Sequence, residues 1–355
     1  MAGRSSRSTT ADPGPRVIGQ GSLGSERGPV AVDAMGGDHA PGAIVAGAVA
    51  AAGDGVPVVL VGDEAAIRAA MPRRKPGSAE VRIVHAPDAV GMGDGAVAAV
   101  RRSEASSLRV ALAQVRDGAA CAAVSCGNTG AVLVAAVVDL GVLPGVERPA
   151  IASILPRADG GRLVLLDAGA NVDCKPEQLV CFAQLGAAYA EVIGIALPRV
   201  GLLANGEEDG KGNAQVRAAL PLLRATGLQV VGNVEPTAAM DGSCDVLVTD
   251  GFVGNVLLKA AEGAVTTVVG LLREEIRRSP SGLAGAWLLQ GAFRRFRERV
   301  AWDAHGGAVL LGTRGTVVVG HGRANAEAVR QAVRMAARTG GAKLVGAIER
   351  RLAAG

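Results

Sequence analysis

The stretch VLLDAGANVDCKPEQLV, residues 164–180, indicates the class of fold. An apolar run of strand length ends at Asp167, a polar turn with Gly169 and Asn171 follows, and an apolar segment of helical length begins at about residue 176. A strand that is apolar at nearly every position is typical of a sheet covered on both faces. The stretch therefore predicts one strand–turn–helix unit of an α/β protein.

The same alternation continues along the chain from residue 29. Candidate strands cover residues 29–33, 56–61, 80–84, 119–125, 150–155, 162–167, 199–203, 228–232, 244–249 and 316–320. Candidate helices cover residues 41–52, 63–71, 104–116, 129–140, 176–194, 213–225, 252–277 and 324–351. We therefore predict a three-layer α/β/α fold with a mostly parallel sheet, and we find neither an internal repeat nor an interdomain linker.

The composition is that of a large chain with an aliphatic core. Of 355 residues, 49% are hydrophobic but only 2% are aromatic, so the core must consist mainly of Ala, Val and Leu. Residues 29–355 are expected to form a single α/β catalytic domain, or two subdomains in close contact. Residues 1–28 lack the apolar segment of a signal peptide or anchor and are expected to be a disordered tail. The sequence contains no run of 18 unbroken apolar residues, so no membrane span is predicted.

Charge, cysteine and histidine content argue against several classes of protein. The net charge of +4 is mild and no zinc-finger or RNP spacing occurs, which argues against a nucleic-acid binder. The five cysteines include no CxxC pair and are expected to be buried and reduced in the cytoplasm. The four histidines show no metal-binding spacing, so no metal site is predicted.

Six predicted strand-to-helix turns carry Asn, Asp or Glu, most of them together with Gly. They cover residues 33–38, 125–130, 167–175, 207–213, 233–235 and 250–255. Ligands of open α/β sheets bind where strands end and helices begin, so these turns form the candidate site. Each turn alone is equally well explained as a structural loop. However, only five of the 37 basic residues are lysines, and Lys175, Lys211 and Lys259 lie in or just beyond these turns.

The turn Gly127–Gly130 is the candidate anion site. Free N–H groups and the helix dipole favour an anion at a helix start, and a nearby Lys would add a cation. No Walker A loop, GxGxxG fingerprint at the first strand or GxSxG elbow occurs. Cys126 is an alternative nucleophile, although no His can be placed beside it. Glu207 and Glu208 either pair with Lys211 and move a proton, or are solvated loop residues.

Residues 285–300, GAWLLQGAFRRFRERV, predict an amphipathic helix after an interruption at residues 279–282. Four of the seven aromatic residues lie between residues 287 and 302, the last of them Trp302. Apolar residues repeat at positions 289, 293, 296 and 300 with helical spacing, and arginines occupy other positions. We expect a projecting element over about 270–303. It either packs on protein, lies at a membrane interface, or attracts an acidic protein partner.

Eight motifs, in their order along the chain, resemble those of the bacterial phosphate acyltransferases of phospholipid synthesis. They are VAVDAMGGDHAP (30–41), RRSEASSLRVAL (101–112), SCGNTGAVL (125–133), RPAIASILP (148–156), LLDAGANVDCKPEQLVCFAQLGAAYAE (165–191), GEEDGKGN (206–213), DVLVTDGFVGNVLLK (245–259) and GGAVLLG (306–312). The resemblance runs from about residue 29 to residue 340. It implies transfer of a fatty acyl group from acyl-acyl-carrier-protein to inorganic phosphate, which gives acyl phosphate.

The resemblance also implies a fold, partners and a location. The fold would be that of isocitrate and isopropylmalate dehydrogenases and of phosphotransacetylase, with no metal or nucleotide cofactor. The chain would form a cytoplasmic homodimer that associates peripherally with the inner face of the cell membrane. It would bind acyl carrier protein and pass its product to a membrane glycerol-3-phosphate acyltransferase. The membrane contact would be made by Trp287, Leu289, Phe293 and Phe296.

The motif positions also define the expected site residues. We expect catalytic roles for Asn128, Asn171, Glu207, Lys211, Asn213 and Lys259. We expect contacts with substrate or phosphate from Gly36, Gly37, Asp38, Gly127, Thr129, Gly130, Asp167, Lys175, Asp250, Gly251, Gly254 and Asn255. In the expected mechanism, phosphate at Gly127–Gly130, helped by Lys211 or Lys259, attacks the thioester carbonyl, and N–H groups or an Asn stabilise the oxyanion.

The chain departs from the family pattern at two places, and other functions stay open. Asn205 stands one position later than usual, and Pro236-Thr237 replaces the Gly-Arg that usually follows residues 233–235. One alternative is a phosphotransacetylase-like enzyme that uses acyl-coenzyme A. A dehydrogenase of the related fold would need a nicotinamide cofactor, and a catalytically weak membrane adaptor would bind vesicles without making product.

Overall fold

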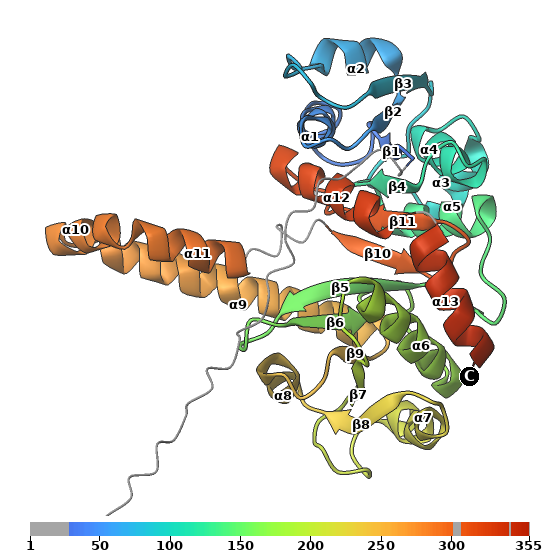
Figure 1. The fold of residues 1–355 in the computed structure, drawn as a ribbon, viewed down its shortest axis with the longest axis vertical. Coiled ribbons are helices and arrows are strands. Elements are labelled where there is room, and N and C mark those ends of the chain that lie inside the picture. The colour runs from blue at the N-terminus through green and yellow to red at the C-terminus, as the bar shows by residue number, and fades with distance from the viewer. Residues whose placement is uncertain (1–27, 301–306, 341, 355) are drawn as a thin grey trace, which may run out of the picture.

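An eleven-stranded sheet runs through the described residues, 28–300, 307–340 and 342–354, of the computed structural model. Its strands are β1 (Val30–Asp33), β2 (Val58–Gly62), β3 (Val81–His85), β4 (Ala122–Ser125), β5 (Ala150–Pro156), β6 (Arg162–Leu166), β7 (Arg199–Leu203), β8 (Gln229–Val234), β9 (Val246–Val248), β10 (Ala308–Leu311) and β11 (Thr316–Val319). Their spatial order is β3-β2-β1-β4-β11-β10-β5-β6-β9-β7-β8 (Figure 1). Trp302 and residues 1–27 of the expected tail lie outside the described residues.

The direction of the strands reverses in the middle of this sheet. Seven strand pairs are parallel, which confirms a mostly parallel sheet. The three pairs β11–β10, β10–β5 and β5–β6 are antiparallel. As a result, the carboxyl ends of β1 and β4 lie on one side of the sheet, along the line where these strands end, which we call the first edge. Strands β6, β9, β7 and β8 end at the opposite edge, which we call the second edge.

Helices pack on both faces of the sheet. They are α1 (Gly42–Gly53), α2 (Glu64–Ala70), α3 (Ala96–Arg102), α4 (Ser107–Arg116), α5 (Thr129–Asp139), α6 (Pro176–Val192), α7 (Ala214–Arg224), α8 (Pro236–Asp241), α9 (Gly251–Arg277), α10 (Pro280–Leu288), α11 (Gln290–Val300), α12 (Ala326–Thr339) and α13 (Ala342–Ala354). Val30 and Val32 of β1 belong to a buried cluster with residues of α1 and α12. Ala31, which points to the other face, packs with Ala111 of α4.

The single helix expected over residues 324–351 is wrong, because the chain forms two helices there. A side chain at Gly340 would lie 2.6 Å from the main-chain oxygen of Ala336 and 2.8 Å from that of Cys121. Only a glycine fits in this space, and α12 ends there. Strand β10 and the helices α3 and α8 are additional to the predicted elements. The two helices have only 7 and 6 residues and show little periodicity.

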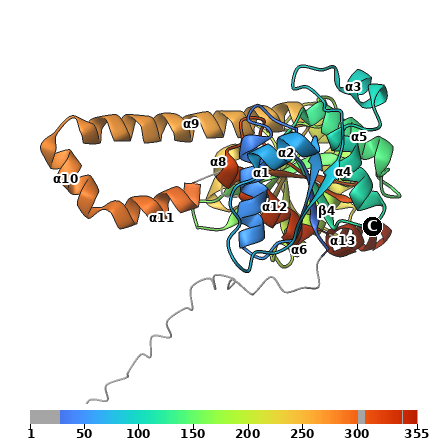
Figure 2. The same cartoon turned by 90° about the horizontal axis from the view of Figure 1, so that it is seen from above.

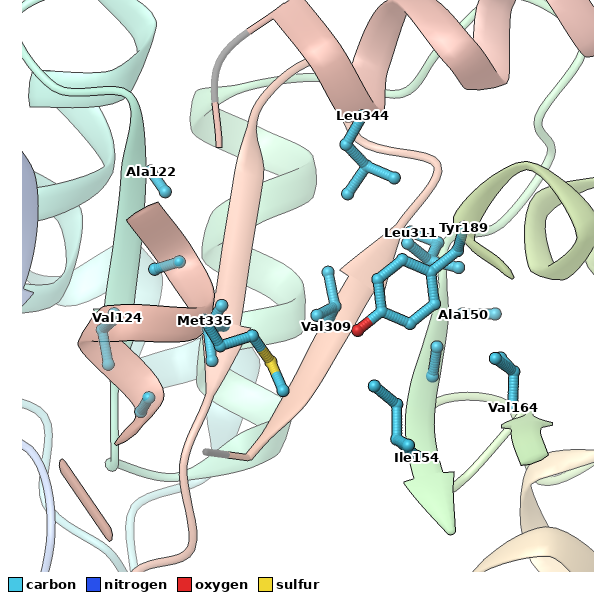
Figure 3. Close-up of a cluster of buried hydrophobic side chains, with 14 of the residues drawn as sticks. Ala122, Val124, Ala150, Ile154, Val164, Tyr189, Val309, Leu311, Met335 and Leu344 are labelled. Carbon is cyan, nitrogen blue, oxygen red and sulfur yellow. The ribbon is translucent and has the colours of Figure 1, made fainter. Parts of the chain in front are cut away.

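The core beneath α6, α12 and α13 is aliphatic around the chain's one tyrosine (Figure 3). The ring of Tyr189 is fully buried and lies among Ala150, Ile154, Val309 and Leu311. Its hydroxyl group has no hydrogen-bond partner within the described part of the chain. Burial raises the pKa of Tyr189 above its usual value. The buried hydroxyl therefore contributes no hydrogen bond to the stability of the core.

Helices α9, α10 and α11 form an arm that extends away from the sheet (Figures 1 and 2). The first turns of α9 pack on β6, and α10 packs back against α9. The rest of the arm leaves large apolar side chains exposed. They include Val268, Leu271, Leu272, Leu283, Trp287, Leu288, Leu289 and Phe296. Such a concentration of exposed apolar surface indicates a contact with a partner or a membrane.

Candidate active site

Asp33 organises the first edge of the sheet. It ends β1, is 3% exposed, and accepts hydrogen bonds from the Ser107 hydroxyl at 2.6 Å and the Ser125 hydroxyl at 2.7 Å. Burial raises the pKa of the Asp33 carboxyl, and the hydrogen bonds from Ser107 and Ser125 partly offset that effect. Asp33 therefore ties together the end of β1, the end of β4 and the start of α4.

Glycines let the loops at this edge approach one another closely. A side chain at Gly36 would lie 2.5 Å from the Asp33 carboxylate and 2.9 Å from the Gly127 nitrogen. Gly37 has φ +113°, which L side chains rarely adopt. The Asp38 N–H donates to the Gly322 carbonyl at 2.8 Å. The loops after β1, β4 and β11 therefore form one compact unit.

The start of α5 keeps free N–H groups. The Gly127 N–H donates to the Ser125 hydroxyl, and the Ala131 N–H donates to the Asn128 side-chain oxygen at 3.1 Å. The N–H groups of Thr129 and Gly130 have no partner among the residues that the structure describes. Two free donors at a helix start, beside loops that only glycine can form, are suited to an anion.

The side chain of Asn128 is already engaged. Its amide nitrogen donates to the carbonyls of Met92 and Asp94, at 3.0 Å each, while its oxygen caps α5. The expected catalytic role as an oxyanion donor is therefore replaced by a structural tie in this conformation. Cys126 is not a nucleophile here either, because burial and the charge of Asp33 raise the pKa of its thiol to about 12.

Asp167 organises the second edge in the same way. Its fully buried carboxylate accepts from the N–H groups of Ile151, Gly169, Ala170 and Asn171 and from the Asn171 side chain, at 2.7–3.1 Å. Burial raises the pKa of Asp167, and these hydrogen bonds act against burial. In this structure these bonds occupy the lone pairs of Asp167, and its expected contact with substrate stays a prediction.

Asn171 also has a supporting role instead of the expected catalytic one. Its amide nitrogen donates to the Pro149 carbonyl as well as to Asp167, and the residue is 5% exposed. Its carbonyl accepts from the Gly251 N–H at 2.7 Å, which fixes the first turn of α9. A side chain at Gly254 would lie 1.9 Å from the Asp167 carbonyl oxygen. Helix α9 is therefore clamped to the loop after β6, and Asp250 caps its start.

The loop after β7 is held by asparagines at both ends. The Asn205 side chain accepts from the Gly212 N–H at 2.9 Å, and the Asn233 side chain donates to the Glu208 carbonyl at 2.8 Å. The Asn213 side chain caps α7, which gives it a structural role here in place of the expected catalytic one. The Lys211 ammonium lies 4.0 Å from the Glu208 carboxylate, so Glu208 is its observed partner.

The structure divides the expected site residues between the two edges. The first edge holds Gly36, Gly37, Asp38, Gly127, Asn128, Thr129 and Gly130. The second edge holds Asp167, Asn171, Lys175, Glu207, Lys211, Asn213, Asp250, Gly251, Gly254 and Asn255. Exposed Lys175 pairs with Glu147 at 3.5 Å. The expected combination of Gly127–Gly130 with Lys211 is therefore not favoured, because it rests on strands that point in opposite directions.

Lys259 follows Gly251 by eight residues, which is roughly 12 Å along α9. Its exposed ammonium pairs with the Glu262 carboxylate of the same helix at 3.0 Å. Leu257 packs on the β6–β8 side and Leu258 also contacts the α5 side. Helical spacing puts Asn255 and Lys259 on one side of α9.

One buried apolar cluster, which we call the apolar floor, joins α5 to the central strands, and Leu258 of α9 packs against it. Its members include Ala131, Ala135, Ile151, Ala168, Leu310 and Val319, with Ala170 and Leu258 packed against them. This buried cluster links the packing of α5 to that of the first turns of α9.

One segment of this site was not among those expected from the sequence. Residues 91–96 bond directly to Asn128 of the loop after β4. The signal for the segment is its glycine content, Gly91-Met92-Gly93-Asp94-Gly95, but it follows no obvious strand–helix turn. Among the described residues, no three His, Cys, Asp or Glu side chains form a metal-binding group.

The fold defines the class of protein first. The structure is similar to a phosphotransacetylase from Streptococcus pyogenes, with a TM-score of 0.57, 16% identity, and coverage of 92% of this chain and 96% of that one. It is also similar to 4-hydroxythreonine-4-phosphate dehydrogenase from Klebsiella pneumoniae, with a TM-score of 0.52, 14% identity, and coverage of 88% and 98%. The chain thus has the α/β fold that these two kinds of enzyme share.

The sequence then defines the family. Residues 29–345 match the family described as "Fatty acid synthesis protein". The phosphate acyltransferase of Trichlorobacter lovleyi is 46% identical over 309 residues, covering 86% of this chain and 89% of the relative. That of Thermus thermophilus is 47% identical over 326 residues, covering 92% and 98%. The chain belongs to this family of phosphate acyltransferases and is an acyltransferase.

Proposed function

We propose that the protein transfers a fatty acyl group from acyl-acyl-carrier-protein to inorganic phosphate and so supplies acyl phosphate for phosphatidic acid synthesis. The observation that carries the proposal is the pair of free N–H groups at Thr129 and Gly130, beside loops that only glycine can form. These groups suit a small, compact anion. The family relationship over residues 29–345 supports acyl transfer as the reaction.

The residues support a direct attack by phosphate. Phosphate bound at Thr129 and Gly130, with its charge balanced by Lys259, attacks the thioester carbonyl carbon through one of its oxygens. The new C–O bond forms, the C–S bond breaks, and the sulfur leaves as thiolate, which takes a proton from water. Because phosphate already carries the electron pair, no protein nucleophile is needed. One N–H donor to the developing oxyanion typically contributes about 3–4 kcal/mol.

The apolar floor is the proposed path of the acyl chain. Its side chains are buried, while α9 beside it exposes apolar surface at Phe252 and Val256. A fatty acyl group would cover this surface and exclude water from the thioester. A short acyl group would cover less of it, which favours a long-chain donor.

The arm supports the proposed homodimer and membrane association. Helix α9, Gly251–Arg277, is long and apolar enough to cross a membrane by length and composition, with mean hydropathy 1.4 and none of its most apolar window buried. Its first turn is clamped to Asn171 and Asp167, so we propose that the exposed part lies against a second copy and the membrane surface. Trp287, Leu289, Phe293 and Phe296 would meet the lipid headgroups on the cytoplasmic face, near a membrane glycerol-3-phosphate acyltransferase.

The second candidate function is that of a phosphotransacetylase-like enzyme using acyl-coenzyme A, and the observation that favours it is the fold. A branched-chain phosphotransacylase from Enterococcus faecalis is also similar, with a TM-score of 0.53 and 16% identity over 88% of this chain and 98% of that one. Comparing turnover with long-chain acyl-acyl-carrier-protein and with acetyl-coenzyme A distinguishes the two. The proposal also includes a three-layer fold that resembles that of the isocitrate and isopropylmalate dehydrogenases.

Exchange of single lysines tests the proposed site. We expect Lys259→Ala to lower phosphate-dependent turnover at least 100-fold, because the variant loses the cation proposed to balance the charge of the phosphate. Lys343→Ala is the matched control, since this exposed residue of α13 lies on another helix, and it should keep wild-type turnover. Loss of activity in Lys211→Ala together with normal activity in Lys259→Ala would refute the proposed site.

A further inference from the structure

Residues 91–96 form a short connection that crosses the start of α5, and we call it the strap. Three of its six residues are glycines. It bridges the two sides of the first edge. On one side, the Asn128 amide donates to the Met92 and Asp94 carbonyls, and a side chain at Gly130 would lie 3.2 Å from the Ala96 Cβ. The strap therefore lies directly against the helix start that carries the free N–H groups.

On its other side, the strap reaches the loop after β11. A side chain at Gly322 would lie 2.5 Å from the Met92 methyl group. Gly322 in turn accepts the hydrogen bond from Asp38. The strap thus spans from α5 to the loop that borders Asp38, which is the width of the proposed phosphate site.

The two ends of the surrounding segment are fixed, but its middle is held at one point. The Ser107 N–H donates to the Asp88 carbonyl at 2.8 Å, and Ala99 and Val100 of α3 are buried against α5. Arg102 pairs with Asp94 at 2.8 Å, which is a bond within the segment. Among the described residues outside 88–107, only the Asn128 side chain makes a hydrogen bond to the strap.

We propose that Asn128 is a positioning residue that latches the strap over the phosphate site. Its oxygen caps α5 while its nitrogen holds two strap carbonyls, so one amide couples the helix start to its cover. The glycines allow the strap to open for substrate entry. The consequence for chemistry rests on the proposed function: a closed strap keeps water from the thioester and from acyl phosphate, which hydrolyse readily.

The variant Asn128→Asp separates the two roles of this side chain. Aspartate caps a helix as well as asparagine does. However, a carboxylate oxygen replaces the amide nitrogen that donates to the two strap carbonyls, so both hydrogen bonds are lost. We expect amide hydrogen exchange at Gly91 and Asp94, whose N–H groups are hydrogen-bonded within the strap, to become at least tenfold faster, since each hydrogen bond lost changes an opening equilibrium about fivefold. Protection of α5 should stay at the wild-type level. Asn325→Asp, which makes the same change at the cap of α12, should leave the strap unaffected.

Two results would overturn the proposed latch. One is unchanged exchange in residues 91–96, and the other is faster exchange that spreads equally through α5. Gly130→Ala is a second test, because the added methyl group displaces Ala96 while the helix cap remains, and it should also speed exchange in the strap. In the acyl transfer assay, Asn128→Asp should raise the ratio of free fatty acid to acyl phosphate several-fold. If no variant forms acyl phosphate, the proposed function fails, while the exchange result still decides the latch.

Discussion

Replacing Gly254 by alanine tests whether α9 is clamped to the loop after β6. An alanine Cβ at this position would lie 1.9 Å from the Asp167 carbonyl oxygen and 3.0 Å from the Thr249 methyl group. Neither neighbour can give way easily, because Asp167 is fixed by five hydrogen bonds and Thr249 is 3% exposed. Overfilling a packed site typically costs about 1–3 kcal/mol.

The matched control lies on the same helix. A side chain at Gly270 of α9 would meet nothing within 4 Å. Alanine is favoured over glycine in a helix interior by about 1 kcal/mol, so Gly270→Ala should stabilise the protein slightly. The two variants make the same chemical change, and we expect their unfolding free energies to differ by about 2–4 kcal/mol.

Urea unfolding measures this difference directly. Equal m-values would show that the midpoints report stability and not a changed unfolded state. We also expect Gly254→Ala to lose acyltransferase activity, because a displaced α9 moves Lys259. A Gly254→Ala variant that is as stable as Gly270→Ala would refute the clamp.

Three further predictions follow from buried groups. Tyr189→Phe should leave the unfolding free energy unchanged or raise it, because the hydroxyl has no partner; a loss of more than about 1 kcal/mol would contradict this. Hydrogen bonds from Arg330 lower the pKa of Asp54, so this pair stabilises the fold above the unfolded pKa of about 3.8 and loses its effect as pH falls through the folded pKa. The stability difference between wild type and Asp54→Asn should therefore shrink below about pH 4, and a constant difference would disprove it. Iodoacetamide at pH 8 should not label Cys126 in the folded protein, since burial raises its pKa to about 12, whereas labelling should occur in urea.

The sequence predicts most of the strands because they are apolar at nearly every position. The run 164–166 and the runs at 30–33 and 246–248 are buried on both faces, as their composition indicates. The direction of a strand, however, leaves no mark on its composition. The hairpins that join β5 to β6 and β10 to β11 reverse the sheet, and β10 is not among the predicted strands.

This reversal explains why the site was only partly predicted. The turns after the strands are correctly located, but their grouping depends on strand direction. Lys211 and Lys259 look equivalent in sequence, whereas the structure places Lys211 in the loop after β7 and Lys259 on the long helix α9, each beside a glutamate. Likewise, Asp167 and Asn171 resemble ligands by composition, and their use inside the loop becomes visible only from their hydrogen bonds.

Phosphate-dependent formation of acyl phosphate is the most direct test of the proposed function. The purified protein would be incubated with long-chain acyl-acyl-carrier-protein, with and without inorganic phosphate, and the product trapped with hydroxylamine. Hydroxamate that appears only with phosphate, and that Lys259→Ala fails to form, is the expected result. A folded protein that forms no hydroxamate under these conditions, or forms equal amounts without phosphate, would contradict direct transfer of the acyl group to phosphate.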